Sequence, residues 1–347
     1  MEGYGLKECG DDEAQLSVSV VIPVYNVERY VDECLQSVFD QTYKNLQLLL
    51  VDDCGSDHSM AVVKECVARN QFHQIGEGED YTSASGVTLK ILHHEHNRGL
   101  SAARNTGIDA ATGDYVYLLD SDDTITPTCI ALLVEQVSLH PGVDMVQGAI
   151  WSNDRSMNDY LHSLSRGWHV RSYTEGRRAC RRLLQYGLLG PMAVNRLLNI
   201  CILRKYKLYF KEGITHEDEL WTFMAGKYLK SIALHIGDTY FYRKNDSGIS
   251  AQFDSEKSFA DMCLISDEMF ERLPFFCDYM IEIRSALRMM ALAERFGSRN
   301  PLQRMRYGSD VFVRAMYRHW NDARWKKAAI VLPCAVGFWF SRFFVRK

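Results

Sequence analysis

The stretch Tyr115-Val-Tyr-Leu-Leu-Asp-Ser-Asp-Asp123 joins a run of apolar residues directly to three carboxylates. Its apolar half has the β-branched and apolar character of a buried central strand. Asp120, Asp122 and Asp123 follow at the carboxyl end of that strand, which is where ligands bind in an open α/β sheet. Carboxylates this close together repel one another unless a cation lies among them. Hard oxygen ligands beside an anionic substrate suit Mg²⁺ or Mn²⁺, although a solvated acidic turn would have the same composition.

Three apolar segments earlier in the chain have the composition of further strands, and the first is apolar enough to be buried on both faces. These strands are expected at residues 17–25, 46–51 and 88–93. Helices with apolar stripes are expected between them, at residues 27–38, 60–66 and 97–113. The alternation of strand and helix predicts an α/β fold with a mostly parallel, doubly wound, Rossmann-like sheet.

Local signals refine this outline. Asn26 is expected to cap the first helix, and Ser56 or Asp57 the second. The polar, Gly- and Ser-rich residues 70–86 predict a surface loop. Beyond the acidic stretch we expect a helix at 131–139, a strand at 144–150, a helix at 177–189, a helix from His216 and one long strand or a strand pair at 232–242. The rest of residues 151–215 shows no clear pattern.

The chain of 347 residues divides by composition into three parts. Residues 1–15 are polar and acidic and predict a flexible tail, residues 16–250 carry the α/β pattern, and residues 251–347 are helical in pattern. The net charge of −4 gives no general attraction to nucleic acid. The ten cysteines include no C-x-x-C pair and no signal peptide precedes them, so we expect reduced thiols and a cytoplasmic location.

Five stretches resemble, in the expected order, the family 2 glycosyltransferases, which are inverting enzymes of the GT-A fold. They are Val20-Val-Ile-Pro-Val-Tyr-Asn26, Leu50-Val-Asp-Asp-Cys-Gly-Ser-Asp57, Asn97-Arg-Gly-Leu-Ser-Ala-Ala-Arg-Asn105, Leu118-Leu-Asp-Ser-Asp-Asp123 and His216-Glu-Asp-Glu219. The resemblance covers roughly residues 17–250. One departure is Cys54, which stands between Asp53 and Gly55 where the family runs from Asp to Gly, and it blurs which aspartate faces the base.

The resemblance implies a nucleotide-sugar donor and favours a UDP-sugar. Pro23, Tyr25 and Glu28 would then lie at the nucleotide cleft, with Asn97 close by. Asp52 or Asp53 would accept a hydrogen bond from the pyrimidine N–H, unless both only form a turn or helix cap. Arg104 would clamp the base or the diphosphate; the alternative for Arg104 is a surface ion pair.

The same resemblance assigns the acidic stretch to the diphosphate. Asp120 would contact ribose or metal, and Asp122 would hold Mn²⁺ or Mg²⁺ as a Lewis acid for the leaving nucleoside diphosphate. Asp123 would bind a sugar hydroxyl or cap the next helix. Arg243 or Lys244 would close over the diphosphate, unless these are ordinary solvated loop charges.

Inversion requires a general base on the face opposite the leaving group, because the acceptor hydroxyl loses its proton as it attacks. Asp218 is the candidate base, and its neighbour Glu217 is a candidate substrate ligand. The alternative is an ordinary acidic first turn, which the helix dipole favours by itself.

Other site classes are disfavoured. His93 and His94 alternate faces of a strand, so the run His93-His-Glu-His96 is a poor zinc site. No G-x-G-x-x-G follows the first strand and no G-x-S-x-G is present, which argues against a dinucleotide dehydrogenase and a serine hydrolase. A nucleotidyltransferase would need an early Gly- and Lys-rich loop, which is absent.

The end of the chain is basic. From Arg284 onward, 14 Lys and Arg face three acids. The apolar residues of Trp325–Phe344 lie between basic flanks, are too few to span a bilayer and are interrupted by Pro333. This pattern predicts a helix in a membrane interface, at the inner face of the cell membrane. The alternatives are packing against the catalytic domain and a dimer contact.

These features together predict an inverting, metal-dependent glycosyltransferase. It would move a hexosyl or N-acetylhexosaminyl unit from the nucleotide-sugar to a hydroxyl of a glycan or lipid-linked oligosaccharide in cell-surface polysaccharide synthesis. The alternative is a non-catalytic protein of the same fold that binds nucleotide-sugars or glycans.

Overall fold

The computed structural model describes residues 15–165, 172–185, 189–245 and 255–271. The expected tail (except residue 15) and the basic terminal segment lie outside the described residues. The chain divides into two compact units, Met1–Gln252 and Phe253–Lys347. The described part of the second unit is helix α9 (Ser255–Glu271), in agreement with the helical pattern predicted after residue 250. None of the helices in the described ranges is long and apolar enough to cross a membrane.

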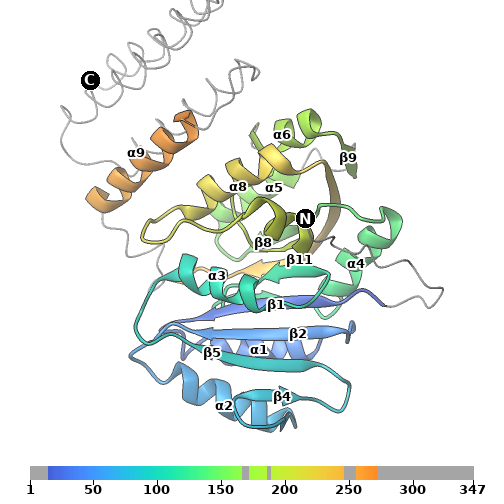
Figure 1. Ribbon diagram of the computed structural model, residues 1–347, viewed down its shortest axis with the longest axis vertical. Helices are drawn as coiled ribbons and strands as arrows, with labels where there is room; N and C mark the ends of the chain where they lie inside the picture. Colours follow the sequence, from blue (N-terminus) through green and yellow to red (C-terminus); the bar gives the residue numbers. More distant parts are fainter. Residues whose placement is uncertain (1–14, 166–171, 186–188, 246–254, 272–347) are drawn as a thin grey trace, which may run out of the picture. The chain divides into compact units, whose positions relative to one another are not determined.

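The first unit is built on one sheet (Figure 1). Its four central strands are parallel, lie in the order β5-β2-β1-β6 and match the prediction closely. They are β5 (Thr88–His93), β2 (Leu46–Asp52), β1 (Val18–Val24) and β6 (Tyr115–Leu118). The strand β10 (Arg196–Asn199) then pairs antiparallel with both β6 and β8 (Met145–Ser152). The α/β class with a mostly parallel core is therefore confirmed, with antiparallel strands added on both sides.

The sheet is completed by β11 (Ser231–Tyr242), which is one long strand parallel to β8, with a register irregularity between His235 and Tyr240. It also pairs with β7 (Thr124–Ile125) and β9 (Tyr173–Glu175). At the opposite edge, β3 (His73–Gln74) and β4 (Asp80–Thr82) form a hairpin on β5. The prediction of a loop at residues 70–86 was therefore wrong in part: their backbone groups pair along the free edge of β5 despite the polar composition.

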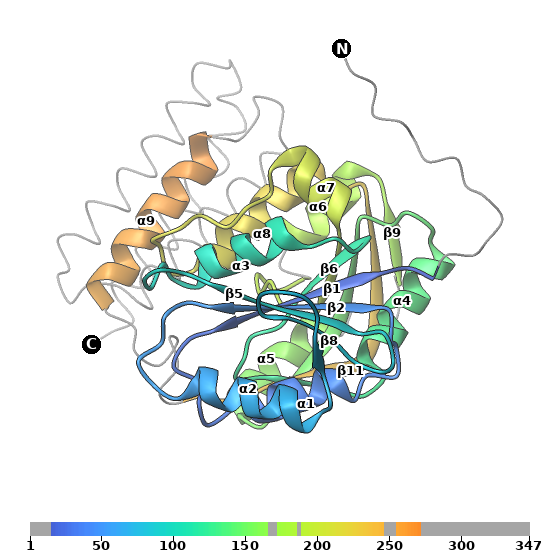
Figure 2. The ribbon, with the colours of Figure 1, turned by 60° about the horizontal axis from the view of Figure 1, so that its bottom comes forward.

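Helices cover both faces of the sheet (Figure 2). One face packs against α1 (Val31–Phe39), α2 (Ser59–Arg69), α4 (Cys129–Leu139) and α5 (Arg155–Ser165). The other face packs against α3 (Leu100–Ala110), α6 (Arg177–Gln185), α7 (Ile200–Tyr206) and α8 (Glu217–Tyr228). Alternate residues of β1 enter the two cores: Val20 and Ile22 enter the first and Val21 the second. Two covered faces explain why β1 and β2 are apolar throughout.

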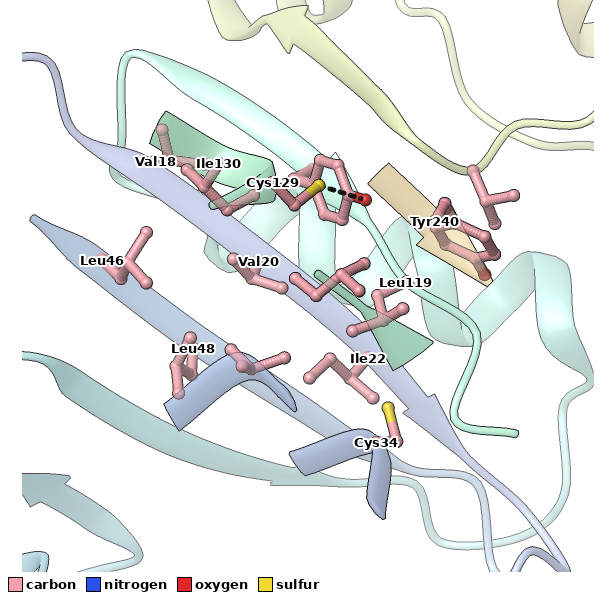
Figure 3. Close-up of a cluster of buried hydrophobic side chains, with 14 of the residues drawn as sticks. Val18, Val20, Ile22, Cys34, Leu46, Leu48, Leu119, Cys129, Ile130 and Tyr240 are labelled. Atoms are coloured by element: carbon pink, nitrogen blue, oxygen red, sulfur yellow. Dashed lines mark hydrogen bonds between the residues drawn. The ribbon is translucent and has the colours of Figure 1, made fainter. Parts of the chain in front are cut away.

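The first core is continuous across the strands (Figure 3). Val20, Ile22 and Leu48 are fully buried there, as are Cys34 of α1 and Cys129 of α4. Cys129 Sγ lies 3.4 Å from the hydroxyl of Tyr117, so this buried phenol has a polar partner. Burial raises the pKa of the Cys129 thiol to about 12, which makes it a packing group rather than a nucleophile.

Asn26 has a different role from the predicted helix cap. The N-cap of α1 is Tyr30, which makes no side-chain capping bond, and Asn26 has a positive φ of 53°. Its side-chain oxygen instead accepts a hydrogen bond from Ser56 N at 2.8 Å. Asn26 thus ties the turn after β1 to the turn after β2. Gly55 lies close against it, since a Cβ there would meet Asn26 atoms at 3.0 Å.

Candidate active site

The turns after β1, β2 and β6 lie at one edge of the sheet because these strands are parallel and in register. Pro23 pairs with Val51 and Val24 with Asp52, so the candidate nucleotide residues of the first two strands are neighbours. Tyr25 is exposed at this edge. Glu28 Oε2 accepts a hydrogen bond from His58 N at 3.0 Å. Glu28 therefore stabilises the turn as well as being a candidate ligand.

The two aspartates after β2 are placed very differently. Asp53 is 2% exposed, and its oxygens accept hydrogen bonds from His94 Nδ1 at 2.6 Å and from the backbone N–H groups of Arg98 and Gly99, both at 2.8 Å. Asp53 is therefore an anchor for the loop that starts α3. Asp52 is more exposed and contacts Cys54 N and His93 Nδ1. Between the two candidates, the geometry favours Asp52 for contact with a base.

Cys54, the departure from the family pattern, adopts a positive φ of 55°. Its thiol donates to the backbone carbonyl of His94 at 2.7 Å. The extra residue is thus accommodated by a left-handed turn that holds β2 against the end of β5. Asn97 accepts a hydrogen bond from Gly99 N at 2.9 Å and otherwise lies exposed, so it also shapes the loop before α3.

His93 and His94 point to different partners, as predicted. His93 lies between Asp52, at 2.8 Å, and Glu79 from the hairpin, at 2.5 Å. His94 lies between Asp53 and Thr106. Burial lowers the pKa of His93, but its two carboxylate partners outweigh burial and raise the pKa overall. No group of three or more His, Cys, Asp or Glu side chains within the described ranges forms a ready metal site.

Arg104 is buried, with its side chain 4% exposed, so it is not a surface ion pair. Its Nη2 donates to Asp120 Oδ1 at 2.7 Å and its Nη1 to Glu217 Oε1 at 2.8 Å. The guanidinium also lies 5.2 Å from the centre of the Phe210 ring. Although burial opposes it, the charges of Asp120 and Glu217 raise the pKa of Arg104. Arg104 therefore joins the acidic turn after β6 to the start of α8, and its expected donor contact stays a prediction.

The donor set of Asp120 and Asp122 fits a divalent cation. Asp120 Oδ1 is held by Arg104 and Asp122 Oδ2 by Asn245 Nδ2 at 2.9 Å. The second oxygens of the two carboxylates, Asp120 Oδ2 and Asp122 Oδ1, take no part in these two hydrogen bonds. Burial and the charge of Asp120 raise the pKa of Asp122, so a nearby cation would stabilise its ionised form. Two carboxylates with substrate phosphates are a usual ligand set for Mg²⁺.

Asp123 does not cap the next helix, because the N-cap of α4 is Thr128. The Asp123 carboxylate is 1% exposed and accepts hydrogen bonds from the Tyr240 hydroxyl at 2.6 Å and from Arg243 N at 2.7 Å. These contacts attach the acidic turn to the end of β11. Sugar binding by Asp123 stays a prediction, and its burial disfavours it.

Arg243 lies beside the acidic turn. Its Nε donates to the Asp122 carbonyl at 3.1 Å, its guanidinium pairs with Glu33, and it packs 5.4 Å from the centre of the Tyr30 ring. Lys244 instead pairs with Asp154 at 3.0 Å. Of the two residues proposed to close over a diphosphate, Arg243 is therefore the one held next to Asp122.

Glu217 and Asp218 form the first turn of α8, directly after His216 with its positive φ of 59°. Burial raises the pKa of both carboxyls, and the Arg104 guanidinium opposes this rise. The pKa of Asp218 thus lies above that of an ordinary aspartate, as suits a general base.

Arg196 is a buried residue near the site that the sequence did not identify as a candidate. It is 1% exposed and donates to Gln147 Oε1 at 2.5 Å, to Thr222 Oγ1 at 3.1 Å and to the Gly190 carbonyl at 2.6 Å. Burial lowers its pKa to about 10, and the charge of Asp218 opposes this. No motif surrounds Arg196, which lies in the segment that showed no pattern, and only its contact with α8 reveals it.

Comparison with known proteins gives relatives for part of the chain. The glycosyltransferase GlyG of Streptococcus pneumoniae serotype 4 is 32% identical over 143 residues, which are 41% of this chain and 42% of GlyG. TuaG of Bacillus subtilis, a putative teichuronic acid biosynthesis glycosyltransferase, is 32% identical over 106 residues, which are 30% of this chain and 36% of TuaG. The match thus spans less than half the length of either relative.

Solved structures share the fold. TarS of S. aureus, residues 1–349 in complex with UDP-GlcNAc, has a TM-score of 0.64 at 18% identity and covers 87% of this chain and 81% of its own. The mannosyltransferase PcManGT of Pyrobaculum calidifontis, in complex with GDP-Man and Mn²⁺, has a TM-score of 0.52 at 14% identity, with coverage of 92% and 87%. Both confirm a GT-A fold for this chain. The family model described as Glycosyl transferase family 2 matches residues 19–204, more than half of the chain, which therefore belongs to that family.

Proposed function

We propose that this chain is an inverting glycosyltransferase that moves a sugar from a nucleotide-sugar, a UDP-sugar in the first instance, to a hydroxyl of a glycan or lipid-linked oligosaccharide. One observation carries the proposal: Arg104 joins Asp120, beside Asp122, to Glu217, beside Asp218. Two carboxylate pairs, to which we assign different tasks, are thereby joined through one guanidinium. The family membership and the TuaG relationship support a role in cell-surface polysaccharide synthesis.

The first pair would serve the donor. Asp122 and Asp120 would hold Mn²⁺ or Mg²⁺, which when bound would neutralise charge on the leaving nucleoside diphosphate. Asp52, with Pro23 and Tyr25 beside it, would bind the base through an N–H of the pyrimidine. Arg243, held at the Asp122 carbonyl, would add a positive charge on the diphosphate side. The structures of TarS with UDP-GlcNAc and PcManGT with GDP-Man and Mn²⁺ support a donor of this class.

The second pair would serve the acceptor. Asp218 would accept the proton of the attacking hydroxyl while that oxygen forms its bond to the anomeric carbon and the nucleoside diphosphate leaves from the opposite face. Its raised pKa makes it a stronger base than an ordinary aspartate. Glu217, held by Arg104, would keep the start of α8 at a fixed distance from Asp120.

A location at the inner face of the cell membrane is the second part of the proposal. Its support is the apolar segment Trp325–Phe344 with basic residues on both sides, which lies outside the described residues. Deletion of residues 324–347 should release the protein from the membrane fraction. An unchanged fractionation would reject this part alone.

Calorimetry with UDP, GDP, CDP and dTDP, each with and without Mn²⁺, tests the donor site. We expect UDP to bind only with Mn²⁺, and Asp122→Asn to abolish this binding. Asp159→Asn, which removes an exposed carboxylate on α5, is the matched control and should bind normally. Failure of every nucleotide to bind would reject the proposal.

Release of UDP from UDP-GlcNAc separates an enzyme from a non-catalytic binding protein on the same fold. The wild type should hydrolyse UDP-GlcNAc slowly, with water as the acceptor. The Asp218→Asn variant should bind UDP normally but should not release UDP from UDP-GlcNAc. Normal UDP binding without any turnover by the wild type, with or without added oligosaccharide, would favour the binding protein.

A further inference from the structure

Trp151 is a large aromatic side chain left exposed at the end of β8. It is 39% exposed, although the strand residues on either side of it are buried. Its ring centre lies 4.4 Å from that of Phe241, with the ring planes tilted by 44°. The two residues are direct register partners in the parallel pair β8 and β11, so they stand on the same face of the sheet. The pair forms one aromatic surface instead of a single stray side chain.

This surface adjoins the candidate active site. Phe241 pairs with Thr124, the residue that follows the acidic turn. The guanidinium of Arg243 lies 5.8 Å from the centre of the Phe241 ring, and its Nε donates to the Asp122 carbonyl at 3.1 Å. A continuous path of contacts thus runs from Trp151 through Phe241 and Arg243 to the backbone of Asp122, one of the two residues proposed to hold the metal.

The surface also faces the side of the sheet that carries the candidate base. Side chains alternate along β8, and Ile150 enters the core with α1 and α4. Trp151 therefore shares its face with Met145 and Ala149, which pack in the same core as Trp221 of α8. The helix α8 begins with Glu217 and Asp218. The candidate base and the aromatic pair are therefore carried on the same side of the sheet.

Polar residues follow both aromatic residues in the sequence. Asp154 pairs with Lys244 at 3.0 Å, which ties the turn after β8 to the residues after β11. Asp154 also accepts hydrogen bonds from Met157 N and Ser156 Oγ, so the start of α5 is fixed to the same turn. Asn153, between Trp151 and Asp154, is exposed. Amide, carboxylate and ammonium groups thus follow the two aromatic residues within three positions along the chain, which is a suitable mixture for a ligand with an apolar face and a hydroxylated rim.

We propose that Trp151 and Phe241 form a platform on which a pyranose ring of the acceptor glycan stacks. A pyranose presents a face of C–H groups with partial positive charge, and the face of an aromatic ring is electron-rich. The sugar hydroxyls project from the ring edge, where Asn153, Asp154 and Lys244 offer partners. This inference rests on the proposed function, since it assigns the platform to the acceptor of that same site. A single exposed aromatic side chain on a protein surface needs no functional explanation. Trp151 differs because it packs against Phe241, and Phe241 is connected through Arg243 to the acidic turn.

Saturation-transfer NMR on the full chain, saturated with UDP and Mn²⁺, tests the platform with tetrasaccharides of β-linked glucose, N-acetylglucosamine and galactose. We expect at least one of them to receive saturation mainly on the protons of its C–H face. Trp151→Ala should weaken its binding about tenfold or more, and Trp151→Phe should retain most of it. Tyr209→Ala is the matched control, because Tyr209 is 38% exposed and bonds to Asp109 near the far end of α3, and it should bind as the wild type does.

UDP calorimetry on the same variants separates this inference from the proposed function. Trp151→Ala should bind UDP with Mn²⁺ within about twofold of the wild type, which shows that the fold and donor site are intact. An undiminished tetrasaccharide signal in Trp151→Ala, or no signal from any tetrasaccharide in the wild type, would overturn the platform. Loss of UDP binding by the wild type would reject the proposed function instead, and the tetrasaccharide signals would still report on the platform.

Discussion

The buried guanidinium of Arg104 lies 2.7 Å from Asp120, and this contact fixes the acidic turn to α3. The same guanidinium reaches Glu217 at 2.8 Å, so one side chain neutralises carboxylates from two distant parts of the chain. Its Nε is the buried side-chain atom without a hydrogen-bond partner among the described residues. A fork of N–H donors can hold two carboxylates at a set separation, which a single ammonium cannot do.

Replacement of Arg104 by Lys should lower turnover far more than donor affinity. The ammonium can stay with one carboxylate, so the separation between Asp120 and α8 is lost, and a misplacement of about 1 Å can lower a rate about 100-fold. Arg104→Met leaves two carboxylates without their cation and should destabilise the fold by about 3–5 kcal/mol. UDP calorimetry, UDP release and urea unfolding measure the three quantities.

A matched control is Arg98→Lys, because Arg98 pairs with Glu212 at 3.3 Å with both side chains more than 40% exposed. An exposed pair contributes about 0–1 kcal/mol, so this variant should be close to the wild type. A large loss of UDP affinity in Arg104→Lys with unchanged turnover would instead support a direct contact between Arg104 and the donor.

Asp218→Asn should abolish transfer and at the same time stabilise the fold. Because burial raises the pKa of Asp218 in the folded protein, its ionised form is less favourable there than in the unfolded chain. This penalty is present above the raised pKa and disappears as the pH falls through it. The midpoint of thermal unfolding of the variant should therefore exceed that of the wild type near neutral pH, and the difference should shrink as the pH is lowered. A lower midpoint for the variant at neutral pH would contradict this account.

The pH dependence of activity should report the same raised pKa of Asp218. The base must be ionised to accept a proton, so the rate of UDP release should fall at acidic pH with a midpoint above that of an ordinary aspartate. A rate that stays constant down to the ordinary range of aspartate would argue against Asp218 as the base.

Tyr240→Phe should destabilise the fold by about 1–3 kcal/mol, since the buried Asp123 carboxylate would lose its hydroxyl partner at 2.6 Å. Tyr209→Phe is a close control, because the Tyr209 hydroxyl also donates to a carboxylate, that of Asp109, at 2.5 Å, but is exposed. Water can replace that exposed bond, so the control should unfold in urea near the wild-type midpoint. Equal midpoints for the two variants would show that the Asp123 contact contributes little.

The central part of the fold could be predicted because it depends on local pattern. Strands buried on both faces appear as apolar runs, and β5 was predicted with its observed bounds, Thr88–His93. The strand β10 could not be predicted, since four residues carry little pattern and their place between β6 and β8 is decided by partners elsewhere in the chain. The hairpin β3–β4 was missed because backbone pairing at a sheet edge needs no apolar side chains.

The candidate site was predictable in its residue types and less so in their roles. The acidic turn and the pair Glu217-Asp218 could be named from motifs, since both come directly before or after a predictable element. Sequence could not separate Asp52 from Asp53, because their difference lies in three hydrogen bonds from a loop more than 40 residues away. Arg196 and Trp151 belong to no motif, and only long-range packing places them near the site.

Gly107→Ala tests how closely α3 must approach the sheet to carry Arg104 to the site. A Cβ at Gly107 would overlap the side chain of Val21 in β1, well inside normal contact. Overpacking of this kind costs about 1–3 kcal/mol, and after the gain of about 1 kcal/mol in helix propensity the net destabilisation should be up to about 2 kcal/mol. Gly226→Ala in α8 is the control, since the nearest atom to its Cβ would be the terminal methyl Cδ1 of Leu184, at 3.1 Å, and the next atoms lie at ordinary contact distances of 3.5 Å and 4.0 Å. In urea unfolding Gly226→Ala should be near neutral, and a Gly107→Ala protein as stable as the wild type would show that α3 can move away from β1 without loss.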